Sequence, residues 1–318
     1  MVKVVLSIFT SAVLAIALVF LLWVYFFKDD NTFISPIPSF LSLGKNTQVK
    51  LLSFWIPRIE GETISEASPT INAKSALVYD LTLEKSLYEK EADLRLPMAS
   101  LTKIMTAIIA IENRKEDGRY LVREENLIGE DTMGLSVNEI LSHEELLYGL
   151  LLPSGNDASE VLAGSFSGGR GKFIQAMNNK AKSLGLSNTS FSGPSGLESD
   201  SSHYTTARDL LVTAKYLISY HPEIINITET FQYEIPQTET HKAFFLENLT
   251  NLVSTYPGVK GIKSGYTDEA GYCLVSYLEY QGHQIVGIVL GSPGAREDMK
   301  ILLDYSLLSV GVEPPSRN

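Results

Sequence analysis

The chain has 318 residues, of which 44% are hydrophobic and 20% charged, and its formal net charge is -11. This length fits one large globular domain or two small ones, and the negative charge argues against a nucleic-acid partner because nothing would neutralise phosphates. The single cysteine, Cys273, excludes an intrachain disulfide, and its apolar neighbours favour a buried thiol over a reactive one.

The N-terminal segment has the length and apolar character of a membrane helix. Residues 4–27 form a run of 24 uncharged residues, enough to span a bilayer core of about 30 Å. Lys3 precedes the run and a net-negative segment, 28–30, follows it, which predicts a cytoplasmic N-terminus. Bulky residues up to the charged boundary favour an uncleaved anchor over a cleaved signal peptide. We therefore expect a single-pass cell-membrane protein with an anchor over 1–30 and an extracytoplasmic catalytic domain.

The rest of the chain divides into a stalk and one domain. Residues 31–66 contain prolines and glycines without periodicity and are expected to be a linker, whereas 67–311 carry regular patterns and 312–318 form a tail. Strands at both ends around a helical middle indicate an α+β fold. The predicted strands are 76–79, 86–89, 273–279 and 284–290, and the predicted helices are 100–113, 146–152, 157–163, 172–184, 206–221 and 296–308.

Ser100 and Lys103 are the first candidates for chemistry. Three residues apart on a helix, they share one face, with Ser100 in the first turn. A neutral lysine can take the proton of a serine hydroxyl and make it nucleophilic, provided that burial or another cation lowers the pKa of the amine. The same spacing occurs at Ser42 and Lys45 in the predicted stalk, so the pair alone is weak evidence. The apolar helix around Lys103 is the stronger argument, because a buried lysine is rare unless paired or functional.

Two further polar triplets could complete such a site. Ser154, Gly155 and Asn156 form a turn between two predicted helices, and 136–138 repeat the serine-to-asparagine spacing without such a stop. Taken alone, the turn is better explained as capping than as catalysis. The triplet Lys263-Ser264-Gly265 is the only K-[ST]-G in the chain, and it reads equally well as an edge strand with an exposed lysine.

The three elements together resemble a known family. The S-x-x-K, S-x-N and K-[ST]-G order is the signature of penicillin-binding proteins and class A β-lactamases. Longer stretches, 96–103, 153–158 and 261–272, resemble the low-molecular-mass penicillin-binding proteins that are D-alanyl-D-alanine carboxypeptidases. The resemblance covers about residues 68–308. It implies a serine β-lactamase/DD-peptidase-like fold, with an antiparallel sheet flanked by helices and an all-helical subdomain.

The resemblance also implies a role for each residue. Ser100 would attack the carbonyl between two terminal D-alanines of a peptidoglycan stem peptide, with Lys103 as proton acceptor, and β-lactams would be covalent inhibitors. No cofactor or metal is implied. The other implied roles are proton relay for Ser154, orientation of the lysine and substrate for Asn156, positive potential for Lys263, carboxylate binding for Ser264 beside Gly265, and an oxyanion hole from the backbone N–H groups of Ser100 and Tyr266.

The sequence departs from the family pattern in several places. Ser264 stands where threonine is usual, so the hydroxyl is kept but its rotamer is less fixed. The β-rich domain and amphipathic C-terminal anchor that often follow the catalytic domain are not expected here, and the N-terminal helix is expected to replace the anchor. We interpret 194–196 as a structural loop, and Arg296, at the start of the last helix, as a solvated charge rather than a site residue.

Several alternatives share the same nucleophile. A β-lactamase, a DD-endopeptidase, a transpeptidase or a penicillin-binding sensor without turnover would carry the same motifs. A zinc peptidase is less compatible, because the histidines are scattered and none forms a His-x-x-x-His pair. They are His143, His203, His221, His241 and His283.

Overall fold

The computed structural model describes residues 68–198 and 201–316. The predicted anchor at 4–27 and stalk at 31–66 lie outside the described residues, as does Ser42. Among the helices described, none is both long enough and apolar enough to cross a membrane.

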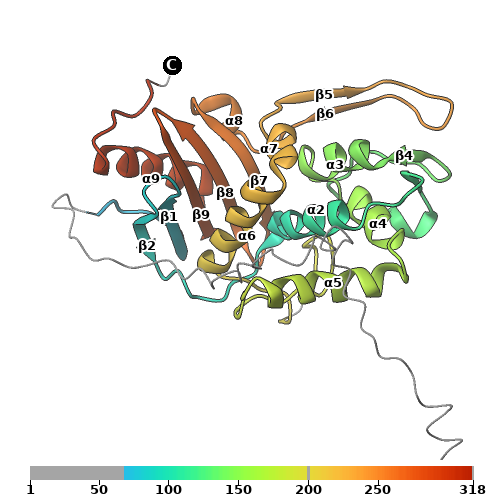
Figure 1. The fold of residues 1–318 in the computed structure, drawn as a ribbon, viewed down its shortest axis with the longest axis horizontal. Coiled ribbons are helices and arrows are strands. Elements are labelled where there is room, and N and C mark those ends of the chain that lie inside the picture. The colour runs from blue at the N-terminus through green and yellow to red at the C-terminus, as the bar shows by residue number, and fades with distance from the viewer. Residues whose placement is uncertain (1–67, 199–200, 317–318) are drawn as a thin grey trace, which may run out of the picture. The chain divides into compact units, whose positions relative to one another are not determined.

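One antiparallel sheet of five strands, in the order β2-β1-β9-β8-β7, forms the centre of the fold (Figure 1). Strands from both ends of the domain meet in it, because β1 pairs with β9 and places Val78 opposite Gly287. β7 lies at one edge of this sheet. The strands are β1 (Ser75–Asp80), β2 (Lys85–Lys90), β7 (Val259–Thr267), β8 (Gly271–Tyr280) and β9 (His283–Ser292).

One face of this sheet is covered by α9 (Ala295–Ser309). Its Leu302, Leu303 and Leu307 have no exposed surface and pack in one apolar cluster with side chains of β1, β8 and β9. The short helix α8 (Leu252–Thr255) contributes Leu252 to the same cluster.

The helical part of the fold surrounds α2 (Thr102–Glu112), which contacts four other helices. All residues from Thr102 to Ala110 are buried, so α2 runs through the core, as its apolar pattern predicted. Ser142 and Glu145 form the predicted capping box at the start of α3. The other helices are α3 (His143–Leu151), α4 (Asn156–Gly164), α5 (Gly169–Ser183), α6 (Ala207–Tyr220) and α7 (Pro222–Thr228). The α+β class, with an antiparallel sheet and a helical subdomain, is thus confirmed.

Two small hairpin-like sheets were not predicted. β3 (Arg119–Leu121) pairs with β4 (Ile140–Ser142), and β5 (Gln232–Ile235) pairs with β6 (Phe244–Glu247). Each strand has only three or four residues, too short for an alternating pattern to stand out in the sequence.

Candidate active site

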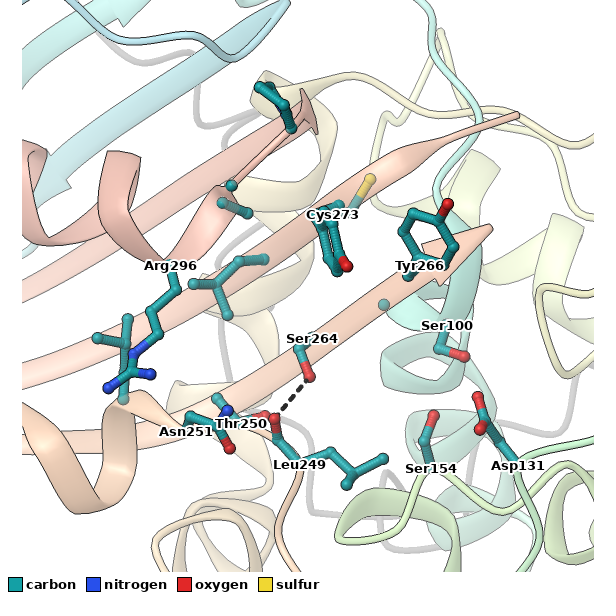
Figure 2. A pocket seen from close by; sticks show the side chains of 17 residues that line it. Ser100, Asp131, Ser154, Leu249, Thr250, Asn251, Ser264, Tyr266, Cys273 and Arg296 are labelled. Carbon is teal, nitrogen blue, oxygen red and sulfur yellow. Dashed lines mark hydrogen bonds between the residues drawn. The ribbon is translucent and has the colours of Figure 1, made fainter. Parts of the chain in front are cut away.

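Ser100 lies in a single 3₁₀ turn, η2 (Ala99–Leu101), that leads into α2. The φ of Ala99 is 47°, in a region that residues with a Cβ rarely occupy. The hydroxyl of Thr102 donates to the Ala99 carbonyl at 2.8 Å, and a Cβ on Gly196 would come within 2.0 Å of that carbonyl oxygen. Neighbouring residues thus hold the turn in place, and the Ser100 side chain points into a pocket (Figure 2). The α-helix itself begins at Thr102, two residues after the predicted helix start at Ser100.

Lys103 has no exposed surface, and its Nζ has three polar neighbours. Nζ lies 2.8 Å from Ser100 Oγ, and it donates to Asn156 Oδ1 at 2.7 Å and to the Ser195 carbonyl at 2.8 Å. A neutral amine has two N–H groups and one lone pair. With Asn156 and Ser195 accepting the two N–H groups, the lone pair is left for the Ser100 hydroxyl, which is the geometry of a general base. The loop at 194–196 therefore holds the lysine in addition to being structural.

The electrostatics of the site favour an uncharged Lys103. Burial lowers the pKa of Lys103 well below its ordinary 10.5, and the nearby charge of Lys263 lowers it further, while the carboxylates of Asp131, Glu198 and Asp157 oppose this shift. Burial also lowers the pKa of Lys263, to about 7, against the charge of Asp131. Burial thus favours the neutral form of both amines, and Lys103 needs that form to accept a proton.

The turn between α3 and α4 supplies the second wall of the site. Ser154 has a φ of 63°, and a Cβ on Gly155 would lie 2.8 Å from the Gly149 carbonyl oxygen, so this turn requires glycine there. Asn156 begins α4, and its N–H donates to the Asp131 carbonyl at 2.7 Å. The Ser154 hydroxyl is buried and has no hydrogen-bond partner in the described part of the chain. It is free to bond with a molecule in the pocket.

β7 forms the third wall. Its Lys263 is fully buried, so the alternative of an exposed lysine on an edge strand is wrong about the lysine. Nζ donates to the Ser264 carbonyl at 3.0 Å. A Cβ on Gly265 would lie 2.7 Å from the backbone nitrogen of Ser100, so glycine lets the strand touch the nucleophile turn. This contact brings together the backbone at Ser100 and Tyr266, the two segments expected to form an oxyanion hole.

These walls enclose one pocket of about 480 Å³. Ser100, Ser154 and Ser264 all point into it (Figure 2). Arg296 also lines this pocket, and its side chain is 42% exposed, so the charge can be solvated and still face the site. The full lining is Ser100, Asp131, Ser154, Leu249, Thr250, Asn251, Leu252, Ser264, Gly265, Tyr266, Tyr272, Cys273, Leu274, Pro293, Gly294, Ala295 and Arg296.

Several residues that line the pocket were not predicted as site residues. Thr250 is buried with its hydroxyl unpartnered among the described residues, and Asp131 lines the pocket, but neither belongs to a motif. Tyr272 lies 4.5 Å from Tyr266 between ring centroids and forms an exposed aromatic pair with it. Tyr272 was inside the stretch that carried the resemblance, whereas nothing in a single sequence marked the other two.

The second serine-to-asparagine spacing, at 136–138, lies outside the pocket. The Ser136 hydroxyl accepts a hydrogen bond from Lys242 Nζ at 2.6 Å, on an exposed loop. Across the described ranges, no three His, Cys, Asp or Glu side chains gather as a possible metal site.

Comparison with known proteins places this geometry in a family. The family model described as D-alanyl-D-alanine carboxypeptidase matches residues 62–294. D-alanyl-D-alanine carboxypeptidase DacF of Bacillus subtilis is 34% identical over 265 residues, which are 80% of this chain and 67% of that protein. The crystal structure of the Streptomyces K15 DD-transpeptidase matches with a TM-score of 0.72 and 30% identity, over 76% of this chain and 100% of that one.

A second similar structure contains a bound β-lactam. Penicillin-binding protein D2 from Listeria monocytogenes, in a cefotaxime-bound form, matches with a TM-score of 0.67 and 31% identity over 76% of this chain and all of that one. The family model alone covers well over half of the residues, and the nucleophile turn, the buried lysine and the K-S-G strand meet in one pocket. This chain therefore belongs to the D-alanyl-D-alanine carboxypeptidase family of serine peptidases.

Proposed function

We propose that the chain is a serine D-Ala-D-Ala carboxypeptidase that removes the terminal D-alanine from peptidoglycan stem peptides. The observation that carries this proposal is the 2.8 Å separation between Ser100 Oγ and Nζ of Lys103, a fully buried amine with a lowered pKa. Such a pair can form and release an acyl-enzyme without a metal or a histidine.

Acylation begins when Ser100 Oγ attacks the carbonyl carbon between the two D-alanines and its proton moves to Lys103 Nζ. The backbone N–H groups of Ser100 and Tyr266 stabilise the negative oxygen that forms. The C–N bond then breaks, and the Ser154 hydroxyl relays a proton from Lys103 to the departing amine. Ser154 suits this role because its hydroxyl is buried beside the nucleophile and lacks another partner in the described chain.

Deacylation repeats the same proton path with water. A water molecule attacks the ester carbon, its proton moves to Lys103, and the bond between the acyl carbon and Ser100 Oγ breaks as Ser100 regains a proton. Asn156 holds Lys103 in place through its 2.7 Å hydrogen bond during both halves of the reaction.

The free carboxylate of the substrate binds at the sheet side of the pocket. Ser264 offers its hydroxyl there, and the Arg296 guanidinium lies further along the same wall (Figure 2). When it is protonated, Lys263 adds positive potential from beneath the strand. Recognition of a terminal carboxylate by these groups makes the enzyme a carboxypeptidase.

The sequence supports a location for this activity. The apolar run at 4–27 and the charges around it are the basis for an anchor in the cell membrane and an extracytoplasmic catalytic domain. There the chain would meet peptidoglycan, and β-lactams would acylate Ser100.

The test uses full-length protein in detergent with a fluorescent penicillin and a D-Ala-D-Ala peptide. We expect Ser100→Ala to abolish both labelling and D-alanine release, because it removes the only atom that forms the acyl bond. Ser42 is the other serine that lies three residues before a lysine, and Ser42→Ala should leave both labelling and D-alanine release unchanged. Labelling that survives Ser100→Ala would refute the assignment.

The reaction products distinguish a carboxypeptidase from the other classes of protein with the same nucleophile. Rapid hydrolysis of the penicillin would indicate a β-lactamase, and transfer to an added amine instead of water would indicate a transpeptidase. Labelling without release of D-alanine would indicate a sensor, and cleavage of cross-linked but not linear peptides would indicate an endopeptidase.

A further inference from the structure

His203 is a buried histidine that the proposed reaction does not use. Its residue is 3% exposed, and it does not line the active-site pocket. Two pairs of backbone hydrogen bonds hold the chain directly after it. Tyr204 pairs with Ser190, and Thr205 pairs with Leu96 in the segment that leads into the nucleophile turn η2. The backbone at His203 is therefore tied to the approach to this turn.

The hydrogen bonds of the His203 ring define its tautomer. The backbone N–H of Ser192 donates to Nδ1 at 3.1 Å, so Nδ1 carries a lone pair and the ring proton is on Nε2. Nε2 lies 2.7 Å from Oγ1 of Thr102. The Thr102 hydroxyl has one hydrogen, which it donates to the Ala99 carbonyl at 2.8 Å. The Nε2–H is therefore the donor to Thr102, and a chain of hydrogen bonds runs from His203 to that carbonyl.

The Ala99 carbonyl and the Ser100 N–H belong to one peptide unit. This unit is planar and its two polar groups point in opposite directions, so a contact that fixes the carbonyl also fixes the direction of the N–H. The carbonyl accepts from both the backbone N–H and the hydroxyl of Thr102. Of these two donors only the hydroxyl can rotate. The Nε2–H of His203 keeps the hydroxyl hydrogen directed at the carbonyl, and such a chain of hydrogen bonds also polarises the N–H.

We propose that His203 is a positioning residue for the oxyanion hole. Acting through Thr102 and the Ala99 carbonyl, it directs the Ser100 N–H at the negative oxygen that forms during acylation. The φ of Ala99 is 47°, an unfavourable value for alanine, so this peptide unit needs outside contacts to stay in place. The inference rests on the proposed function, which gives the Ser100 N–H its role, and it adds a residue that none of the three motifs contains.

Two substitutions distinguish the two ring nitrogens. In His203→Asn the side-chain oxygen can replace Nδ1 and accept from Ser192, but the side chain is too short to reach Thr102. In His203→Gln the terminal amide N–H takes the place of Nε2–H and can donate to Thr102. We expect the acylation rate constant to fall about tenfold in His203→Asn, a part of the roughly 100-fold or more that loss of an oxyanion donor costs. In His203→Gln it should stay within about threefold of wild type, because the donor to Thr102 is kept.

The rate constant is measured by stopped-flow labelling of the full-length protein in detergent over a range of fluorescent penicillin concentrations. This series separates the acylation rate constant from the dissociation constant of the noncovalent complex. In His203→Asn the rate constant should change and the dissociation constant should not, because the negative oxygen exists only after attack has begun.

Thr102→Val tests the middle of the hydrogen-bond chain. It removes the hydroxyl, and we expect a loss of about tenfold in the acylation rate constant. The double variant His203→Asn/Thr102→Val should be no slower than the slower single variant, because both changes break the same chain. The acyl-enzyme gives a spectroscopic check. Its ester carbonyl stretch in the infrared difference spectrum should move to higher wavenumber in His203→Asn, since a misdirected N–H polarises the carbonyl less.

His143→Asn is the matched control. His143 is also buried, at 5% exposed, and its Nδ1 lies 3.1 Å from the Tyr120 hydroxyl, but it does not line the pocket. The control should lower the melting temperature and leave the acylation rate constant within about twofold of wild type. Melting temperatures of all variants show which of them are folded at the temperature of the assay.

Several results would overturn the inference. One is an unchanged acylation rate constant in His203→Asn. Another is a His203→Gln variant that acylates no faster than His203→Asn, which would mean that the ring acts through Ser192. Losses that multiply in the double variant, or an ester carbonyl stretch that does not move, would do the same. Failure of the proposed function is separate, because wild-type protein would then bind penicillin at Ser100 but release no D-alanine.

Discussion

For the single residue Lys263, burial of the amine lowers the stability of the fold and makes the site more reactive. It is fully buried, and its amine donates to only one carbonyl, that of Ser264, among the described hydrogen bonds. A protonated amine in such surroundings is poorly solvated, so folding is less favourable than with an apolar side chain of similar volume. The same burial lowers its pKa to about 7 and places its charge where it acts on Lys103.

Lys263→Met should therefore stabilise the protein while it impairs catalysis. The unfolded chain keeps Lys263 protonated up to its ordinary pKa of 10.5, whereas the folded chain releases that proton near pH 7. Between these values the unfolded state binds more protons, so wild-type stability rises with pH. The variant lacks this slope. The free energy of unfolding of Lys263→Met should exceed that of wild type by about 2–4 kcal/mol at pH 7, and the difference should shrink towards pH 10.

Denaturant unfolding at pH 7 and pH 9.5 measures the difference in the free energy of unfolding. Lys182→Met removes an exposed lysine and serves as the control, with little effect at either pH. A Lys263→Met variant no more stable than wild type at pH 7 would show that the folded protein solvates this charge well.

At the scale of elements, the edge strand β7 and the turn η2 meet through a backbone contact. The K-S-G triplet could be found in the sequence because its residue types are specific. The burial of Lys263 could not be found in the sequence. It depends on α7 and other helical segments, which are distant in the chain and pack over the strand. The role of Ser195 could not be predicted either. Its backbone carbonyl accepts a hydrogen bond from Lys103, and a backbone contact leaves no mark on the residue type.

Gly265→Ala should impair acylation much more than folding. The added Cβ would lie 2.7 Å from the Ser100 nitrogen, so the strand and the turn must separate. A displacement near 1 Å in an active site can cost about 100-fold in rate, and we expect a loss of that order in penicillin acylation. Gly171→Ala is the control, because its Cβ would meet no atom within 4 Å and it lies in α5. It should leave acylation intact and raise stability by up to about 1 kcal/mol.

Stopped-flow labelling with the fluorescent penicillin gives the acylation rates, and thermal unfolding gives the stabilities. An acylation rate for Gly265→Ala within twofold of wild type would show that the turn can move aside without consequence.

At the scale of the whole molecule, the pocket forms where three distant segments meet, around Ser100, Ser154 and Lys263. The order of these segments carried enough information to predict their meeting, because each motif has a known structural setting. The place of Asp131 on the pocket wall could not be predicted in the same way. Its place depends on a loop held by Asp157, and no local pattern in the sequence reports a hydrogen bond made 22 to 24 residues away.

The packing of α9 on the sheet can be weakened at a residue that does not line the pocket. Leu302 on α9 is fully buried in the apolar cluster on the face that α9 covers, and it does not line the pocket. Leu302→Ala should lower the free energy of unfolding by about 2–5 kcal/mol through the cavity that it leaves. Below the melting transition, kcat/KM for D-alanine release should stay within about twofold of wild type, since Leu302 contributes no atom to the pocket lining. Ile301→Ala, on the same helix but 42% exposed, should destabilise much less. A Leu302→Ala variant that is folded but slow would mean that α9 also positions Arg296, at its own first turn, for substrate binding.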